Sequence, residues 1–436
     1  MFRTKTTIAS AIVLASSGLA HAGDINISGF LSAGGGSIAD EELCHDVYPV
    51  GHPSAGQPNT DTSCGYAGYE SEDFTFDVDS LVGIQITGNV SDKMAVTAQL
   101  VARGQNDNEV TAEWAYVAYT VNDNFKWRMG RLRTPFYMLS DYVDVGYAYN
   151  WISAPSEVYY LPFNNVQGMD ALFNFTAGSF DGLVQAYAGA FTDSFTLSGV
   201  DVSTKSRNQT GISLQMNRDW LTLRAAYHRA ELTLDVPNLT ALSAGVSAFC
   251  TSLAAANAVF PGFSDCGTID YEKFVVNEDD GTFLDAAISV DTGRFLAVAE
   301  TATFKLDNSP FSEDKRSYLM VGIRFGDIVL HATYAKADDK SQASDMLEGL
   351  PADTGTSFTA GHPLFNTQQA LATGLAQLRA GAAYAADSQV DEHTTNTIGM
   401  RWDFTSSAVF KLQYDILKRD DVDDQKLIRF AFQSVF

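Results

Sequence analysis

The last twelve residues constrain the fold more than any other part of the chain. Gln425 to Phe436 reads QKLIRFAFQSVF, and Ile428, Phe430, Phe432 and Phe436 fall on one face of an extended strand. An alternation of apolar and other side chains with a period of two residues, which gives one apolar face, is typical of a half-buried β-strand. A strand that closes a barrel in lipid can end on an aromatic residue, with acyl chains outside and water inside. The pattern therefore predicts a transmembrane β-barrel.

The first residues have the features of an export signal. A basic start is followed by the apolar stretch Ile8 to Leu19 and by the small-x-small sequence Ala20-His21-Ala22. That stretch is too short to span a bilayer, which takes roughly 20 residues. We therefore expect residues 1–22 to be a cleaved signal peptide. Residues 23–436 are then one barrel domain in a bacterial outer membrane.

Alternating segments of about ten residues recur along the chain, joined in turn by short turns and longer loops. An even number of antiparallel strands lets an up-and-down barrel close with both ends on one side. A barrel of sixteen strands is about 32 Å across, too wide for side chains to fill, so its lumen holds water or an inserted segment. We predict sixteen strands, at 25–35, 74–90, 94–104, 110–121, 125–133, 169–177, 183–191, 209–217, 220–232, 282–290, 294–305, 316–325, 328–335, 394–404, 409–418 and 425–436.

Composition excludes some partners. The formal net charge of -25 argues against nucleic acid, because a polyanion requires a basic surface. After the signal no stretch approaches 18 uninterrupted apolar residues, so we expect no helical membrane span. Frequent Phe, Tyr and Gly in short alternating segments suit an all-β barrel.

Four cysteines form two local pairs, Cys44 with Cys64 and Cys250 with Cys266. An exported chain permits disulfides, although four cysteines allow three connectivities. A bridge that closes a loop of this length stabilises by about 3 kcal/mol in the chain-entropy model. The nearby histidines match no familiar zinc spacing, so we predict no metal site.

Two stretches, 240–260 and 367–386, are rich in Ala and Leu near helical spacing and lie inside long predicted loops. The simplest interpretation is a pair of short helices folded over the barrel mouth. A lid or a partly inserted plug is the alternative.

Residues 113–131 read EWAYVAYTVNDNFKWRMGR. The acidic residue, the aromatic-valine pair, the short turn and the Gly-Arg that ends the next strand resemble the general porins of Gram-negative outer membranes. The aromatic C-terminus is similar to the one that this family presents to the barrel-assembly machinery. The resemblance implies a sixteen-stranded barrel, a homotrimer, a third long loop folded inward to narrow the pore, and recognition of Phe436 during assembly.

The segment from Thr134 to Gln167 takes the place of that constriction loop. It is crowded with aromatic residues and contains three carboxylates and no Lys or Arg. Carboxylates that face arginines across a narrow lumen would set up a transverse field that orients polar solutes. Arg131 is the wall arginine that we expect first at the pore, and Arg133 shares its face. The predicted constriction residues are Asp141, Asp144, Glu157, Arg103, Arg131 and Arg133.

These features predict a channel for passive diffusion of small hydrophilic solutes, with a preference for cations given the acidic excess. A substrate-selective channel, for a sugar or an aromatic acid, is an alternative, as is an adhesin or receptor that acts through the long loops. No histidine lies in a recognisable nucleophile motif, so we predict no enzyme, no catalytic residue and no cofactor. Acidic runs in the outer loops could bridge through divalent cations to lipopolysaccharide, although solvated loop charge is the simpler interpretation.

Overall fold

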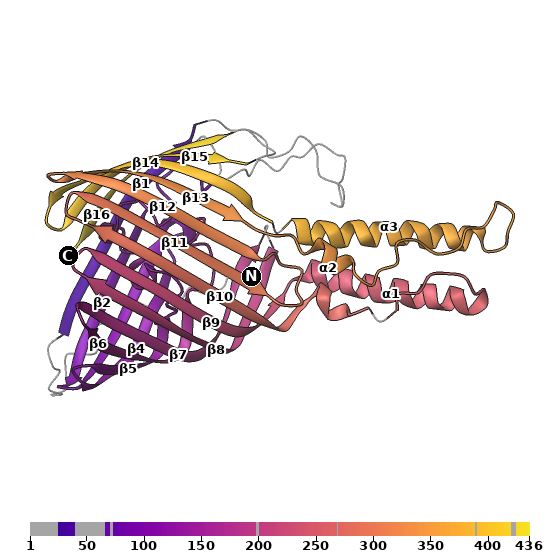
Figure 1. The fold of residues 1–436 in the computed structure, drawn as a ribbon, viewed down its shortest axis with the longest axis horizontal. Coiled ribbons are helices and arrows are strands. Elements are labelled where there is room, and N and C mark those ends of the chain that lie inside the picture. Colours follow the sequence, from indigo (N-terminus) through magenta and orange to yellow (C-terminus); the bar gives the residue numbers. More distant parts are fainter. Residues whose placement is uncertain are drawn as a thin grey trace, which may run out of the picture.

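The chain forms a closed antiparallel barrel whose strands are joined in sequence order, with β1 returning to pair with β16 (Figure 1). The computed structural model describes residues 25–39, 66–69, 73–197, 200–267, 269–388, 390–419 and 424–436. The predicted signal peptide and the Cys44–Cys64 pair lie outside these residues. In the closing seam Phe30 lies opposite Val435, and the Gly29 amide donates to the Phe436 carbonyl oxygen over 2.8 Å.

The described residues contain sixteen strands, as predicted. The strands are β1 Ile25–Ile38, β2 Leu81–Ser91, β3 Met94–Arg103, β4 Val110–Asn122, β5 Phe125–Arg133, β6 Asn165–Ala177, β7 Phe180–Leu197, β8 Val200–Arg218, β9 Leu221–Asp235, β10 Val276–Asp291, β11 Phe295–Leu306, β12 Asp314–Phe325, β13 Ile328–Asp338, β14 Glu392–Thr405, β15 Ala408–Lys418 and β16 Gln425–Val435. The helices are α1 Pro237–Val259, α2 Ala343–Leu347 and α3 Phe365–Asp387, with 3-10 turns at Gly104–Asn106, Ser140–Tyr142, Gly146–Ala148 and Tyr271–Phe274.

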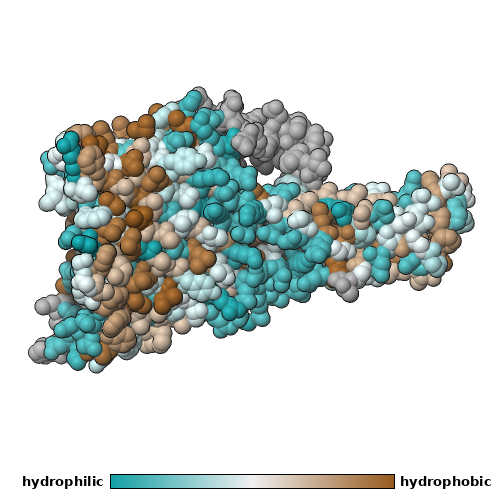
Figure 2. All heavy atoms as spheres, in the orientation of Figure 1, coloured by the Kyte–Doolittle hydropathy of each residue, from teal (hydrophilic) through white to brown (hydrophobic). Residues whose placement is uncertain are grey.

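Side chains alternate across the wall as a membrane barrel requires. On β13, Leu330 and Tyr334 face outward and are about half exposed, whereas His331 and Thr333 face inward and are buried. The apolar outward residues form a band around one end of the barrel in Figure 2. An apolar band on the outside of a closed barrel is the surface that matches acyl chains.

The wall is uneven in height. β5 has 9 residues, whereas β7 and β8 have 18 and 19. The predicted strands at 183–191 and 209–217 were therefore too short. On β8 the buried inward residues Thr204 and Ser206 and the exposed outward residues Lys205 and Arg207 are all polar, so the sequence there loses the period-two signal that marks a strand.

The helices α1 and α3 project away from the barrel as an antiparallel arm (Figure 1). The prediction that helices of these loops cover the mouth was wrong. They bury their apolar residues against each other, with Val246, Phe249 and Leu253 of α1 packed in one cluster with Leu371 and Leu375 of α3. The predicted Cys250–Cys266 disulfide is confirmed and ties α1 to the segment that follows it. Because the arm has its own small core, it does not need to pack on the barrel.

One of the described helices, α1, is long and apolar enough to cross a membrane by length and composition. Searching for uninterrupted apolar residues missed this, because Ser, Thr, Asn and Gly interrupt the run. In the structure α1 packs against α3 in the arm.

Candidate functional site

A folded loop enters the barrel and reaches across it. Residues 134–164 follow the short strand β5, turn into the lumen and return to β6; we call them the inner loop. Their contacts reach the opposite wall, from β9 to β16. The inward-facing wall residues Gln185, Glu300 and Gln413 are only 2 to 4% exposed. The sequence allowed water or an inserted segment in the lumen, and the structure shows an inserted segment.

Wall cations hold the inner loop by its backbone. Lys411 of β15 is 1% exposed. Its Nζ donates to the carbonyl oxygens of Gly146 at 2.6 Å, Tyr149 at 2.8 Å and Trp151. Arg401 of β14 donates from Nη1 to the carbonyls of Tyr147 and Tyr149, both at 2.8 Å. Charged donors make the stronger class of hydrogen bond, so these contacts fix the path of the loop.

The same pattern continues around the barrel. Arg224 of β9 donates to the carbonyl oxygens of Pro135 and Phe136, and Gln433 of β16 donates to that of Ile152 over 2.7 Å. Lys411 lies between the outward residues Phe410 and Leu412, so the alternation of β15 turns it inward. The sequence does not predict which carbonyl oxygens accept these hydrogen bonds, because every residue has the same backbone carbonyl group.

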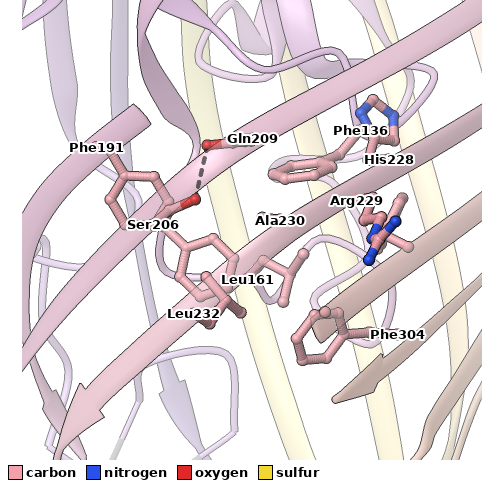
Figure 3. Close-up of a pocket in the computed structure, with 13 residues that line it drawn as sticks. Phe136, Leu161, Phe191, Ser206, Gln209, His228, Arg229, Ala230, Leu232 and Phe304 are labelled. Atoms are coloured by element: carbon pink, nitrogen blue, oxygen red, sulfur yellow. Dashed lines mark hydrogen bonds between the residues drawn. The ribbon is translucent and has the colours of Figure 1, made fainter. Parts of the chain in front are cut away.

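Aromatic packing closes the gap between the inner loop and β7–β12. Trp151 packs edge-on against Tyr318, and its Nε1 donates to Thr333 Oγ1 over 2.8 Å. Phe136 and Leu161 of the loop face Phe191, Leu232 and Phe304 of the wall (Figure 3). The cavity left between them is about 20 Å³, room for little more than one water molecule. The wall is largely apolar around this cavity, although the same strands carry buried polar residues such as Arg224 and Glu300 elsewhere.

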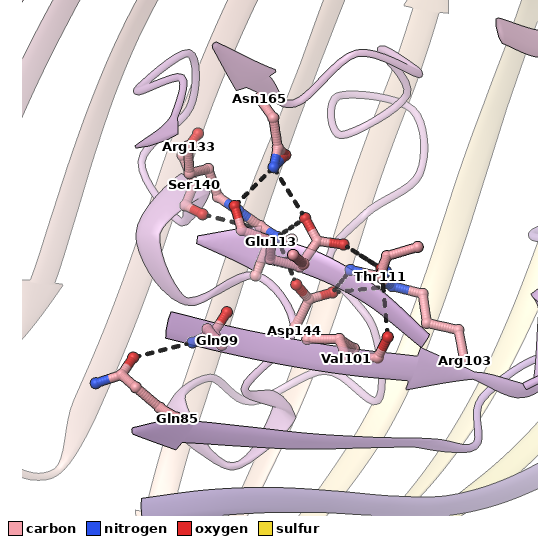
Figure 4. A network of polar contacts seen from close by, with 12 residues as sticks. Gln85, Gln99, Val101, Arg103, Thr111, Glu113, Arg133, Ser140, Asp144 and Asn165 are labelled. Atoms are coloured by element: carbon pink, nitrogen blue, oxygen red, sulfur yellow. Dashed lines mark hydrogen bonds and ion pairs between the residues drawn. The ribbon is translucent and has the colours of Figure 1, made fainter. Parts of the chain in front are cut away.

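An alternating ring of charges anchors the start of the inner loop (Figure 4). Asp144 of the loop accepts from Arg103 of β3 and from Arg133 at the end of β5, both at 2.7 Å. Glu113 of β4 accepts from the same two arginines at 2.7 and 2.8 Å. Three of the predicted residues, Asp144, Arg103 and Arg133, are thus brought together. They lie in direct contact rather than on opposite sides of a water-filled gap.

Glu113 is the member of this ring that was missed. A register shift between β3 and β4 falls at this residue, which lies between Ala112 and Trp114 of the paired rows. Asn165 also donates from Nδ2 to the Glu113 carbonyl oxygen over 2.8 Å. A β-bulge changes the face of the sheet on which one side chain lies, and no residue type predicts a bulge from a single sequence.

Glu157 anchors the far end of the inner loop. Its buried carboxylate accepts from Tyr66 over 3.1 Å and from Thr395 of β14, and it lies 3.5 Å from Nε2 of His393. Nδ1 of His393 is 2.7 Å from Asp391. Glu157 is therefore a buried anchor and does not line an open passage.

A second contact ties the inner loop to the same group of charges. Tyr160 of the loop donates to Asp314 over 2.5 Å, and Arg316 pairs with Asp339 at 2.6 Å and with Asp391 at 3.2 Å. We call residues 157, 160, 314, 316, 339, 391 and 393 the outer anchor. Burial is the largest cause that raises the pKa of Asp339, and the charge of Asp314 raises it further. The pKa is about 7, although the charge of Arg316 lowers it. The pKa of Asp391 is lowered to about 2, because its bond to His393 and the charge of Arg316 outweigh burial.

The outer anchor should loosen as pH rises. Because the pKa of Asp339 is raised in the folded state, the contribution of Asp339 to the stability of the outer anchor is fully present below pH ~4. This contribution is lost as the pH rises through about 7, while Asp391 stays ionised over the same range. We expect a thiol introduced by Ser156→Cys, next to Glu157, to react with maleimide several-fold faster at pH 8 than at pH 5.5, relative to the same thiol in the Asp339→Asn variant. The Asn variant corrects for the pH dependence of the thiol itself. An equal ratio at both pH values would contradict the assignment.

Two predicted residues lie apart from these anchors. Asp141 is exposed and makes no hydrogen bond or ion pair within the described part of the chain. Arg131 does not reach the inner loop. It lies on the outer wall opposite Gln167 of β6, next to the half-exposed pair Met129 and Met169, and its Nε donates to the Ala112 carbonyl oxygen over 2.6 Å. Instead Arg128 points inward and pairs with Asp170 at 2.5 Å.

The fold and the apolar outer band define the class of protein. A closed sixteen-stranded antiparallel barrel with alternating outward apolar residues is a transmembrane barrel of the bacterial outer membrane. Within that class it has the fold of the outer-membrane porins and channels.

The comparisons with known proteins support the fold. No protein-family model and no curated protein matches the sequence. Among solved structures, the anion-selective porin from Comamonas acidovorans has a TM-score of 0.51 at 10% identity, over 95% of this chain and 99% of that chain. The outer membrane channel DcaP of Acinetobacter baumannii has a TM-score of 0.49 at 11% identity, over 95% and 97%. The first likeness carries the fold assignment, and identities this low carry no substrate.

Proposed function

We propose that the chain is an outer-membrane channel for small hydrophilic solutes whose passage requires movement of the inner loop. The observation that carries this proposal is the nature of the contacts between loop and wall. Much of the interface consists of polar side chains that hold carbonyl oxygens, and water can replace such contacts at modest net cost when they separate. A barrel with a permanently sealed interior has no need of a polar inner face.

The inserted loop favours a selective pathway over free diffusion. Liposome swelling with sugars of graded size is the discriminating experiment. Uptake that saturates with solute concentration supports selection by the inner loop, and unsaturable, size-dependent uptake supports passive diffusion. Absence of both swelling and bilayer current would contradict the channel itself.

We further propose a preference for cations. Asp144 and Glu157 are held in anchors, so Asp141 is the loop carboxylate that remains open to solvent. In planar bilayers under a salt gradient, Asp141→Asn should shift the reversal potential toward zero, whereas Asp280→Asn, on the outward face of β10 where it pairs with Arg229, should leave it unchanged. An unchanged potential in the Asp141 variant would remove this residue from the pathway.

A receptor or adhesin role remains a second, compatible candidate. The arm of α1 and α3 extends from the barrel and exposes Val259 and Phe260 at the end of α1, 77 and 40% exposed. The homotrimer, the contacts with lipopolysaccharide and the recognition of Phe436 by the assembly machinery remain predictions from the resemblance.

A further inference from the structure

One short segment of the inner loop gathers its carbonyl oxygens around a single ammonium group. We call the carbonyl oxygens of Gly146, Tyr149 and Trp151 the carbonyl nest. All three accept from Nζ of Lys411, those of Gly146 and Tyr149 at 2.6 and 2.8 Å. A lysine ammonium has three N–H donors on one atom, so the nest satisfies the whole group.

The nest recognises a cation without using a carboxylate. Nζ of Lys411 lies 5.0 Å from the centre of the Tyr149 ring, within the range of cation–π attraction. The Tyr149 hydroxyl donates to the Val143 carbonyl oxygen over 2.7 Å, which holds the ring in place. No carboxylate pairs with Lys411 in the part of the chain that the structure describes. The recognising groups therefore all belong to the inner loop, and the wall supplies only the cation.

The local backbone brings the three oxygens together. Gly146 begins the 3-10 turn Gly146–Ala148, and the backbone is extended at Tyr149 directly after it. A Cβ on Gly146 would lie 2.2 Å from Nε2 of Gln433, so any side chain there would push the loop off the wall. Ala148 is exposed, so solvent lies beside the nest.

Other ligands fit the nest less well than a primary ammonium group. Carbonyl oxygens repel an anion, and Ca²⁺ takes about 6–8 oxygen ligands, among them carboxylates. A hydroxyl group of a sugar has one donor and would leave two acceptors unsatisfied. The ammonium group of a lipid headgroup does not reach the nest, because the nest lies inside the wall.

We propose that the carbonyl nest binds the primary ammonium group of a small solute, and that Lys411 occupies the nest when the loop is closed. This assignment rests on the proposed channel and names small primary alkylammonium ions as a class of its solutes. When the inner loop leaves the wall, the nest moves away from Lys411 and its acceptors face the passage. A solute that binds the nest in that position stabilises the open state, because a ligand shifts an equilibrium toward the state that it binds better.

The test follows a thiol introduced by Ser153→Cys, whose reaction with maleimide in detergent reports how often the inner loop leaves the wall. The reaction needs no current, so failure of this assignment is distinguishable from failure of the channel. The probe is n-propylammonium chloride at millimolar concentration and neutral pH, with equal potassium chloride or 1-propanol as controls. With Lys411 intact, we expect the probe to raise the reaction rate several-fold and the controls to leave it unchanged.

The variant Lys411→Ala should reverse the sign of this effect. Alanine keeps Cβ, and n-propylammonium has the three carbons and the ammonium group that the substitution removes. The probe fits the emptied space only when the loop is closed, where it gains packing for its carbons as well as the three acceptors. We expect Lys411→Ala to raise the reaction rate and the probe to lower it again several-fold. Gln433→Ala removes a different wall donor, to the Ile152 carbonyl oxygen, and leaves the nest occupied, so the probe should not slow its reaction.

Three results would overturn the proposal. Without slowing by the probe in Lys411→Ala, the nest is not a site for a free ammonium group. Slowing there without acceleration in the protein with Lys411 intact would mean that the nest serves only the chain's own lysine. Equal effects of potassium chloride and n-propylammonium would show that the nest does not select a primary ammonium group.

Discussion

Lys411→Met should open the barrel. Lys411 holds three carbonyl oxygens of the inner loop from a site that is 1% exposed. Met keeps the length of the side chain and removes the donors, so the closed position would bury three unsatisfied acceptors, while in the open position water reaches them. We expect the closed state to lose about 2 kcal/mol, which raises the open-to-closed ratio roughly thirtyfold. Single-channel recording in planar bilayers measures that ratio directly.

The matched control is Lys336→Met. Lys336 faces outward on β13 and pairs with exposed Asp338 at 2.9 Å. A surface pair of this kind contributes little, so the recordings should match those of the wild type. If Lys411→Met shows the wild-type open probability, the wall cations do not hold the loop closed.

Arg133→Met should be the most destabilising single change in the anchor at the start of the inner loop. Its side chain is 4% exposed and one nitrogen, Nη2, contacts both Glu113 and Asp144. Removal of one partner from a buried ion pair leaves charge uncompensated and typically costs about 3–5 kcal/mol. Reversible urea unfolding in detergent micelles, followed by tryptophan fluorescence, gives the free energy of unfolding.

Arg131→Met is the control for that measurement. The two arginines are two residues apart on β5, so simple alternation puts them on the same face. In micelles without added lipid we expect Arg131→Met to change the free energy of unfolding by no more than about 0.5 kcal/mol, as for most surface substitutions. Equal losses in the two variants would show that the ring of Arg103, Glu113, Arg133 and Asp144 is not an anchor.

The barrel could be predicted because its determinants are local. Alternation on strands such as β15 and β16 survives wherever one face meets lipid and the other the interior. The strands β7 and β8 were cut short where both faces are polar and the alternation disappears. The two helices of the arm were predicted at the right place in the sequence but were wrongly expected to lie over the barrel mouth. The packing of Val246 and Leu253 on Leu371 joins segments more than a hundred residues apart, which no local pattern reports.

The site could be predicted in outline. The position of the inner loop after the fifth strand and its carboxylates led to Asp144, Arg103 and Arg133. Simple alternation placed Arg131 with Arg133, but Arg133 ends its strand and turns with the chain toward Asp144, whereas Arg131 stays on the wall. Glu113 was missed because it lies in a β-bulge, which simple alternation does not predict. The hydrogen bonds that Lys411 donates to the inner loop were missed because their acceptors are backbone atoms.

The central claim is that solutes pass only when the inner loop leaves the position it occupies in the structure. A photocleavable bis-maleimide between thiols introduced at Ser153 of the inner loop and Gln413 of the opposite wall would hold the loop in place in a bilayer. Ile152, next to Ser153, donates from its amide to Gln413 over 3.2 Å, so the two sites are close. We predict that the cross-linked channel carries no current and that cleavage by light restores it. Full current through the cross-linked channel would contradict the account.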